Sequence, residues 1–204
     1  MIKTTAILRD ELKEYVNPDA KIKSLVNKNE LYIVTRGLYE TERNVSGYCL
    51  AGAIYGLSYL SFEFALSYHG LIPEAVYTFT NATYDKKKRK QFENIFGVFT
   101  YRDIPCNAFP YGVELQKEGD YYYWIAGAEK ALCDMLYKAP PQNNITTLQQ
   151  YLFDDLRIEP EALYNLDIDK LLQLCSLYHT KNHKLLRSFL RRRMANGYDF
   201  TAND

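Results

Sequence analysis

The residues best suited to chemistry near the N-terminus are cations that can meet a phosphate backbone. They occur in "NPDAKIKSLVNKN" (17–29) and within "ELYIVTRGLY" (30–39). In a DNA reader, lysines on a helix contact phosphates and base acceptors of the major groove, and an arginine on a hairpin reaches the adjacent backbone or minor groove. The alternative is a solvated helix face beside an ordinary hairpin. The candidate DNA-binding residues are Lys21, Lys23, Asn27, Lys28 and Arg36.

Two further clusters of positive charge occur later in the chain. The run "KKKRK" (86–90) is expected in a connection between two strands. Residues 179–194 carry six bases and no acid, after a segment, 146–174, with six acids and two bases. Such clusters contact DNA, RNA or an acidic protein surface, or they are simply solvated. The candidate partner-binding residues are Lys86, Lys87, Lys88, Arg89, Lys90, Arg191, Arg192 and Arg193.

The basic segment 179–194 also has an internal explanation. Its apolar residues have helical spacing, so burial against the preceding acidic helices would hold it in place. Opposite charges would then set its orientation, and the three arginines at its end would remain free for a partner protein or nucleic acid. The residues expected to be buried are Leu185, Leu186, Phe189 and Leu190.

Two patterns point towards metal chemistry, and neither is complete. Asp103 and "ELQ" (114–116), which we place on adjacent strands, faintly resemble a metal-dependent nuclease whose lysine is replaced by glutamine. Such a site needs a second carboxylate close by to hold Mg²⁺. His179 and His183 lie four residues apart, a spacing that places both on one face of a helix, but no carboxylate lies between them. We expect no metal, no cofactor and no catalysis.

Charged residues also interrupt the apolar stretch "AEKALCDML" (128–136), which we predict to be a helix. Glu129 suits the positive end of the helix dipole, and Lys130 with Asp134 is an i,i+4 pair that we place on the outer face. His69, at the end of an earlier apolar helix, is expected to bond to carbonyl groups. The core side of the 128–136 helix is predicted to be Ala131, Leu132, Met135 and Leu136.

Start and stop signals predict where the main elements begin and end. Asn17 is a natural N-cap, and Pro18 suits the first position of the helix that follows. A tight hairpin comes next, with Arg36 at or near its tip. A buried helix is then expected from a cap at Ser61 to a stop at Gly70.

The order of the remaining elements predicts an α+β fold with a mixed or antiparallel sheet. The predicted organisation is a reduced winged helix-turn-helix in 1–45, an α+β core in 46–141 and a helical extension in 142–204, whose last nine residues are expected to fray. The other predicted elements are a helix over 5–15, strands over 76–84 and 96–104, a hairpin over 111–126 closed by 118–120, a helix over 126–140 that ends at Pro140-Pro141, and helices after 142.

The composition restricts the class of protein. The chain has 25 basic and 25 acidic residues, whereas a dedicated nucleic-acid binder is usually basic. No apolar run reaches the ~18 residues of a membrane span, and acids lie where a signal peptide would be apolar. The four cysteines contain no CxxC pair and are read as reduced thiols. These features predict a cytoplasmic protein without a membrane partner.

Four stretches of the chain, taken together, have a distinctive sequence: "ELYIVTRGLY" (30–39), "SYLSFEFALSYHGLIPE" (58–74), "FGVFTYRDIP" (96–105) and "IAGAEKALCDMLY" (125–137). They resemble the AbiEi-like antitoxins of type IV toxin–antitoxin systems, and "YLFDDLRIEPEALYNLD" is similar to the helical tail of Bacteroidetes-type members. The resemblance implies a winged helix-turn-helix that binds the operon's own promoter. It also implies a C-terminal region that neutralises a cognate nucleotidyltransferase toxin. Longer members place three helices before the hairpin, and this chain has room for about two.

The predicted function is therefore that of an antitoxin and transcriptional autorepressor of a bacterial toxin–antitoxin operon. Its expected partners are promoter DNA and the cognate toxin, and a homodimer would add phosphate contacts across two half-sites. One alternative is a protein-interaction module that does not bind DNA. Its 19 tyrosines and the "YYYW" run at 121–124 favour that reading, because tyrosine is common at interfaces. A degenerate nuclease is the other alternative.

Overall fold

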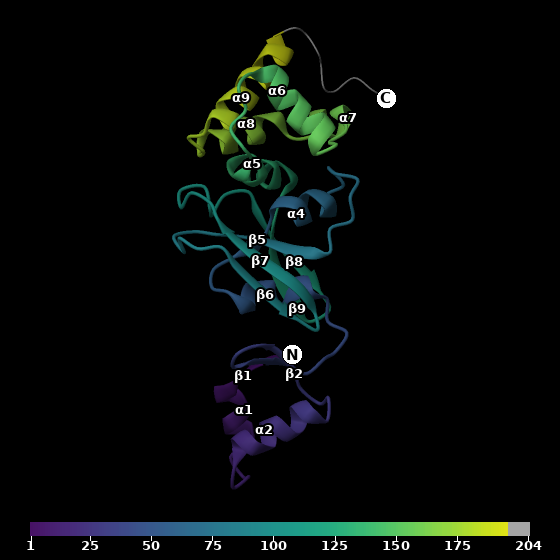
Figure 1. The fold of residues 1–204 in the computed structure, drawn as a ribbon, viewed down its shortest axis with the longest axis vertical. Coiled ribbons are helices and arrows are strands. Elements are labelled where there is room, and N and C mark those ends of the chain that lie inside the picture. The colour runs from purple at the N-terminus through teal and green to yellow at the C-terminus, as the bar shows by residue number, and fades with distance from the viewer. Residues whose placement is uncertain (196–204) are drawn as a thin grey trace.

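The N-terminal residues form a small unit of two helices and a three-stranded antiparallel sheet (Figure 1). The computed structural model describes residues 1–195 of the chain. Strand β1 pairs with β3, and β3 pairs with β2, so the first strand lies beside the hairpin. The elements of this unit are β1 (Ile2–Thr4), α1 (Thr5–Glu11), α2 (Pro18–Asn27), β2 (Tyr32–Thr35) and β3 (Leu38–Glu40).

The predicted capping of α2 is confirmed. The Asn17 side chain accepts a hydrogen bond of 3.0 Å from the Ala20 amide, and Pro18 is the first helical residue. Helix α1, predicted over 5–15, ends earlier, with Leu12 as its C-cap. A proline disfavours helical geometry in the residue before it, and Asn17 is accordingly extended. A separate turn therefore joins the two helices.

The unit has its own small core and rests on the rest of the molecule through its hairpin. The Asn94 side chain donates a hydrogen bond of 2.7 Å to the carbonyl of Val34, and the rings of Tyr32 and Phe96 meet edge to face. These contacts place the hairpin against the turn between β6 (Lys90–Asn94) and β7 (Gly97–Asp103). The buried residues of the small core are Leu8, Ile22 and Leu31, packed by Leu12, Leu25, Val26 and Tyr39.

The centre of the molecule is a six-stranded mixed sheet in the order β6-β7-β5-β4-β9-β8. Two neighbouring pairs, β5 with β7 and β4 with β9, are parallel, and the others are antiparallel. The predicted strands over 76–84 and 96–104 and the hairpin over 111–126 are confirmed. Strand β6 was not predicted, because its charged sequence lacks apolar alternation. The strands are β4 (Tyr59–Leu60), β5 (Thr78–Thr83), β6 (Lys90–Asn94), β7 (Gly97–Asp103), β8 (Val113–Glu118) and β9 (Tyr121–Ala126).

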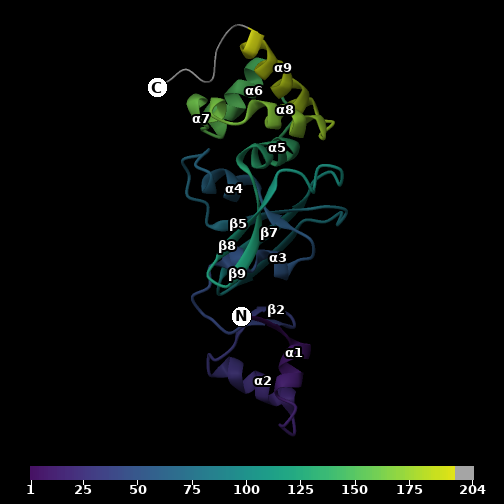
Figure 2. The same ribbon diagram turned by 180° about the vertical axis from the view of Figure 1, so that it is seen from behind.

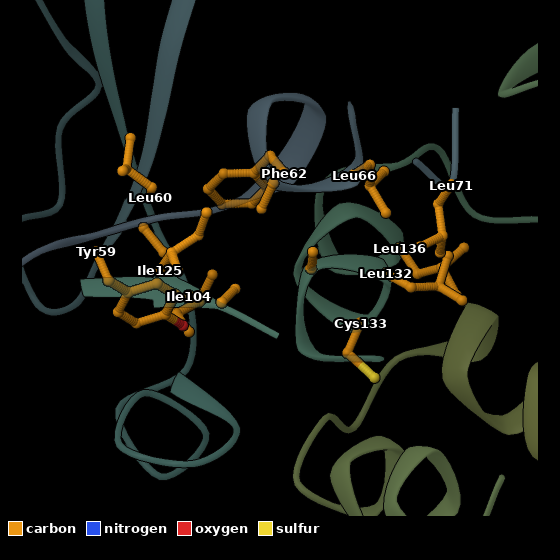
Figure 3. Close-up of a cluster of buried hydrophobic side chains, with 14 of the residues drawn as sticks. Tyr59, Leu60, Phe62, Leu66, Leu71, Ile104, Ile125, Leu132, Cys133 and Leu136 are labelled. Carbon is orange, nitrogen blue, oxygen red and sulfur yellow. The ribbon is translucent and has the colours of Figure 1, made fainter. Parts of the chain in front are cut away.

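Helix α5 (Ala128–Lys138) lies between this sheet and the C-terminal helices (Figures 1 and 2). Figure 3 shows Leu66 of α4 (Phe62–Tyr68) beside Leu132 and Leu136 of α5. On the opposite side, the thiol of Cys133 lies 3.7 Å from that of Cys175 in α8 (Ile168–Ser176). Because neighbours cover it on several sides, most of α5 is buried. Two short helical turns, η1 (Gly47–Cys49) and α3 (Ala51–Ile54), precede β4.

The C-terminal helices share one hydrophobic core with the sheet and α5. In α9, Leu186, Phe189 and Leu190 are buried and Leu185 is partly buried, as the spacing of the apolar residues predicts. The predicted fraying of 196–204 lies outside the described residues. Among residues 1–195, no helix has the length and apolar character that a membrane span requires. The helices are α6 (Ile145–Gln150), the π-helical turn η2 (Tyr151–Asp155), α7 (Pro160–Tyr164), α8 (Ile168–Ser176) and α9 (Lys181–Ala195).

Candidate nucleic-acid interface

The outward face of α2 carries short side chains. Residues three, four or seven apart lie on the same side of a helix, and this spacing joins Asn17, Ala20, Ser24 and Asn27. The opposite face, around Ile22, packs into the small core. A helix whose outward face carries only short side chains can approach the floor of a DNA groove closely.

Lysines flank this face on both sides. Lys21 and Lys28 lie on one flank of this face and Lys23 lies on the other. Each residue of a helix turns by about 100°, so Lys21 and Lys23, two positions apart, point in directions about 200° apart. The ammonium of Lys21 lies 4.8 Å from the centre of the Tyr15 ring, whereas Lys23 and Lys28 are exposed. The lysines therefore form two borders around the short side chains, with Asn27 between them.

The hairpin brings Arg36 to the Lys23 flank of α2. The turn joining β2 to β3 is Arg36-Gly37, and Gly37 adopts φ +79°, which glycine tolerates without strain. The amide of Thr5 donates a hydrogen bond of 3.0 Å to the Gly37 carbonyl, which fixes the tip beside α1. The prediction of Arg36 at the hairpin tip is confirmed.

Lys23 and Arg36 line one open hollow of about 370 Å³. This hollow separates α2 from the hairpin tip, so the two cations border the same surface. Lys21, Asn27 and Lys28 do not line it. The complete lining is Thr5, Arg9, Asp19, Ile22, Lys23, Arg36, Gly37 and Tyr39.

Arg9 is a member of this surface that the sequence did not suggest. Its Nε and Nη2 atoms bond to the two Asp19 oxygens at 2.8 and 3.0 Å. The hydrogen bond from Arg9 lowers the pKa of the Asp19 carboxyl, which keeps the pair ionised and neutral overall. The pairing follows from the way α1 packs on α2, so neither helix alone carries a signal for it.

Internal ion pairs leave the predicted cations available. In the N-terminal unit, Glu11 pairs with Lys3 at 2.6 Å, and Asp19 pairs with Arg9. Within residues 1–195, no ion pair of 4.0 Å or less involves Lys21, Lys23, the C-cap residue Lys28 or the arginine of the hairpin. The lining of the hollow contains three basic side chains and one acidic one, so it is locally positive although the chain is neutral. Such a surface suits phosphate contacts.

The lysine run lies away from this surface. Lys90 begins β6 opposite Tyr101, and Asn94 ends it opposite Gly97, next to the N-terminal unit. The run therefore occupies the far end of β6. Its members are mainly exposed, but the Lys87 amide bonds to Asp103 at 2.6 Å, and the Lys86 ammonium lies 5.4 Å from a tyrosine ring.

The C-terminal arginines do not form one free group. Arg191 and Arg192 are exposed near the end of α9. Arg193, which we expected to be free, lies 4.0 Å over the ring of Tyr164 and donates a hydrogen bond to its hydroxyl. A helix places successive residues about 100° apart, so three adjacent arginines point in different directions. These residues lie at the opposite end of the molecule from α2 (Figure 1).

Lys130 and Asp134, predicted on an outer face, are fully buried instead. Their charged groups pair at 3.1 Å, and the Lys130 ammonium also donates to the Ala108 carbonyl at 2.8 Å. Burial lowers the pKa of Lys130, which the Asp134 charge opposes. The prediction failed because the helix has no solvent face at this point.

Three hydroxyl groups complete the surroundings of Asp134. Tyr59 donates at 3.0 Å and Ser61 at 2.7 Å, and Tyr178 also donates to the carboxylate. Ser61 was predicted to cap α4, but its side chain makes no capping hydrogen bond and serves Asp134 instead. The carboxylate thus joins α5 to β4 and to the segment after α8, which is a structural role.

The two histidines predicted to share a helix face do not. His179 is exposed before α9 begins, and His183 is buried within it. The His183 ring stacks on Tyr178 at 4.4 Å, and its Nε2 bonds to the Cys133 carbonyl at 2.9 Å. Burial lowers the pKa of His183 to about 4, so the ring is neutral near pH 7. His69 bonds to the Ala126 carbonyl at 2.8 Å, as predicted.

The nuclease-like residues are not adjacent. Asp103 ends β7 and Glu114 lies on β8, and three strands separate β7 from β8 in the sheet. Asp103 instead accepts a hydrogen bond of 2.6 Å from Thr83. Across the described part of the chain, no three histidine, cysteine or acidic residues are grouped so as to hold a metal ion.

No known protein family matches this chain, and no curated protein does either. The resemblance to AbiEi-like antitoxins therefore depends on the four sequence stretches quoted above.

Proposed function

We propose that this chain is an antitoxin that represses its own operon, with residues 1–45 acting as a reduced winged helix-turn-helix. The strand order β1-β3-β2 and the position of α2 before the hairpin support this assignment. The observation that carries the proposal is the shared surface of α2 and the hairpin tip, where Lys23 and Arg36 border one hollow.

In this proposal α2 enters the major groove of promoter DNA. Its short outward side chains permit close approach, and the Asn27 amide is suited to the paired donor and acceptor of adenine. The flanking lysines meet phosphates on both sides of the groove, while Arg36 contacts the backbone or minor groove beside it. A homodimer doubles these contacts, which compensates for the neutral charge of the whole chain.

The toxin half of the proposal rests on the sequence resemblance. The toxin is expected to be a nucleotidyltransferase encoded beside this chain. The exposed cations of the lysine run, with Arg191 and Arg192, are the proposed partner contacts, because they lie away from the DNA surface. A cytoplasmic protein is expected for both roles.

A fluorescence-anisotropy titration with DNA from the chain's own promoter tests the repressor role. Replacing Lys21, Lys23 and Arg36 by alanine should weaken binding and reduce the salt slope by up to about 3, at ~1 for each lost phosphate contact. A matched control changes Lys86, Lys87 and Lys88 to alanine, which removes the same charge at the far end of β6. Equal weakening by both triple variants would refute the assigned surface. No binding of the unchanged protein at low salt would refute the repressor role.

A protein-interaction module without DNA binding is the second candidate. The observation in its favour is an exposed apolar face on the β8–β9 hairpin, formed by Leu115, Tyr122 and Trp124. Such a face is typical of interaction surfaces. This candidate predicts rescue from the toxin together with no retardation of promoter DNA.

A further inference from the structure

An apolar hollow of about 300 Å³ opens beside the one tryptophan of the sequence. It lies where the segment before β4 and the segment after β7 meet the β8–β9 hairpin. Trp124 borders the hollow with about half of its surface exposed, and two further aromatic rings line it. The lining residues are Leu57, Ser58, Tyr59, Phe109, Pro110, Val113 and Trp124.

The lining determines the charge and size of a suitable ligand. None of the seven side chains is ionisable near pH 7, so a charged ligand would lose its hydration without a compensating partner. The volume is at the lower end of the range for ligand sites. One aromatic ring or a fused pair fits this space, and aromatic neighbours favour a planar, apolar ligand.

Ser58 supplies a polar group that the protein itself does not use. The residue is 9% exposed, and its hydroxyl has no hydrogen-bond partner among the described residues. An unpaired buried hydroxyl destabilises the protein. A ligand that forms a hydrogen bond to it therefore gains more binding free energy than it would from a hydroxyl that is already bonded to water. Ser58 is itself one of the residues that line the hollow. The Tyr59 hydroxyl, in contrast, is engaged by Asp134 at 3.0 Å.

We propose that this hollow binds a small, neutral aromatic molecule that carries one hydrogen-bonding group. The rings of Trp124 and Phe109 contact the aromatic part of the ligand, and the hydroxyl of Ser58 bonds to its polar atom. The site lies on the central body, away from α2 and the hairpin tip, so it is independent of the proposed DNA binding.

The test is a titration of the full chain with p-cresol and with toluene, which has the same ring and methyl group but no hydroxyl. Trp124 reports binding through its fluorescence, excited at the red edge where phenols do not absorb. We expect a saturable shift of emission to shorter wavelength with p-cresol and weaker binding of toluene.

Two comparisons of variants distinguish binding in this hollow from nonspecific quenching of the Trp124 fluorescence. Val113→Phe fills the hollow and should abolish saturable binding, whereas Leu115→Phe, outside the lining on the same face, should retain it. Ser58→Ala should weaken p-cresol binding about threefold to tenfold and leave toluene unchanged. Thermal melting checks that each variant is folded. A linear response, equal binding by the two phenylalanine variants, or no effect of Ser58→Ala on the p-cresol to toluene ratio would overturn the proposal.

Discussion

The N-terminal unit and the central body use charged residues in opposite ways. In the unit, the Arg9–Asp19 pair lies at the surface, with more than half of each side chain exposed. In the body, the Lys130–Asp134 pair is fully buried and surrounded by hydroxyl groups. Water screens the first pair, so its contribution to stability is small. The second pair is costly to break, because either partner alone would be an uncompensated buried charge.

The hydrophobic core of the N-terminal unit is also much smaller than that of the central body. Three buried residues, Leu8, Ile22 and Leu31, form the centre of the unit, whereas one continuous core joins the sheet to the C-terminal helices. A unit with so little buried area has low stability of its own and depends on its docking to β6. We therefore expect the body to be rigid and the proposed DNA-binding unit to unfold locally.

The largest loss of stability is expected from substitutions that remove apolar contacts between α9 and the body. Leu186→Ala combined with Phe189→Ala should reduce the free energy of unfolding by about 5 kcal/mol or more, because each truncation leaves a cavity. Urea denaturation measures this loss. The control, Arg191→Ser with Arg192→Ser, alters exposed residues of the same helix and should leave stability nearly unchanged. A large loss in that control would reveal an ionic network at the helix end.

A loss of about 3–5 kcal/mol is expected when the buried ion pair is broken by Asp134→Ala, because the Lys130 charge then has no counterion. The double replacement Lys130→Met with Asp134→Leu should recover much of this loss, since no buried charge remains. Urea denaturation of the three proteins provides the comparison. Equal stability of Asp134→Ala and the unchanged protein would contradict the burial of a charged pair.

Because His183 is buried, we expect the stability of the body to depend on pH. The unfolded chain binds a proton on His183 near pH 6.5, whereas burial holds the folded pKa at about 4. The contribution of His183 should therefore lower the free energy of unfolding by about 3 kcal/mol as the pH drops from about 6.5 to about 4, and this contribution should level off below that. His183→Gln should lose this part of the slope, and the exposed His179→Gln should retain it. Identical slopes in the two variants would exclude His183 as the cause.

In the unit, Ile22→Ala should remove about 2–4 kcal/mol of local stability, which is a large share of so small a core. Amide hydrogen exchange should become fast in residues 1–41 and remain slow in α5, and promoter binding should weaken. Leu66→Ala, in the main core, is the control that should lower protection throughout the body. If Ile22→Ala also raised exchange in α5, the two regions would be one cooperative unit.

The smallest effect is expected for the surface pair. A double-mutant cycle of Arg9→Ala and Asp19→Asn should give a coupling free energy much smaller than the same cycle for Lys130 and Asp134. Salt should reduce the first coupling and leave the second nearly unchanged. A coupling of similar size in both cycles would contradict the contrast between surface and buried pairs.

Local features of this protein could be predicted from its sequence, because the interactions that produce them span a few residues. The cap of α2 needs only Asn17, Pro18 and the Ala20 amide, and the hairpin turn needs Gly37 at positive φ. Burial of one face of α9 follows from the spacing of its leucines. The five candidate DNA contacts belong to these local elements, so their placement on α2 and the hairpin tip could be predicted as well.

Only the tertiary structure determined which distant residues meet. Arg9 reaches Asp19 through helix packing, and strand order separates Asp103 from Glu114 by three strands. A lysine and an aspartate four residues apart can pair on the surface of a helix or in a core, so their spacing in the sequence does not show whether the pair is buried. The burial of Lys130 and Asp134 instead follows from α5 being covered by both the sheet and the C-terminal helices. Their partners come from far along the chain, because Tyr59 is 75 residues from Asp134 and Tyr178 is 44.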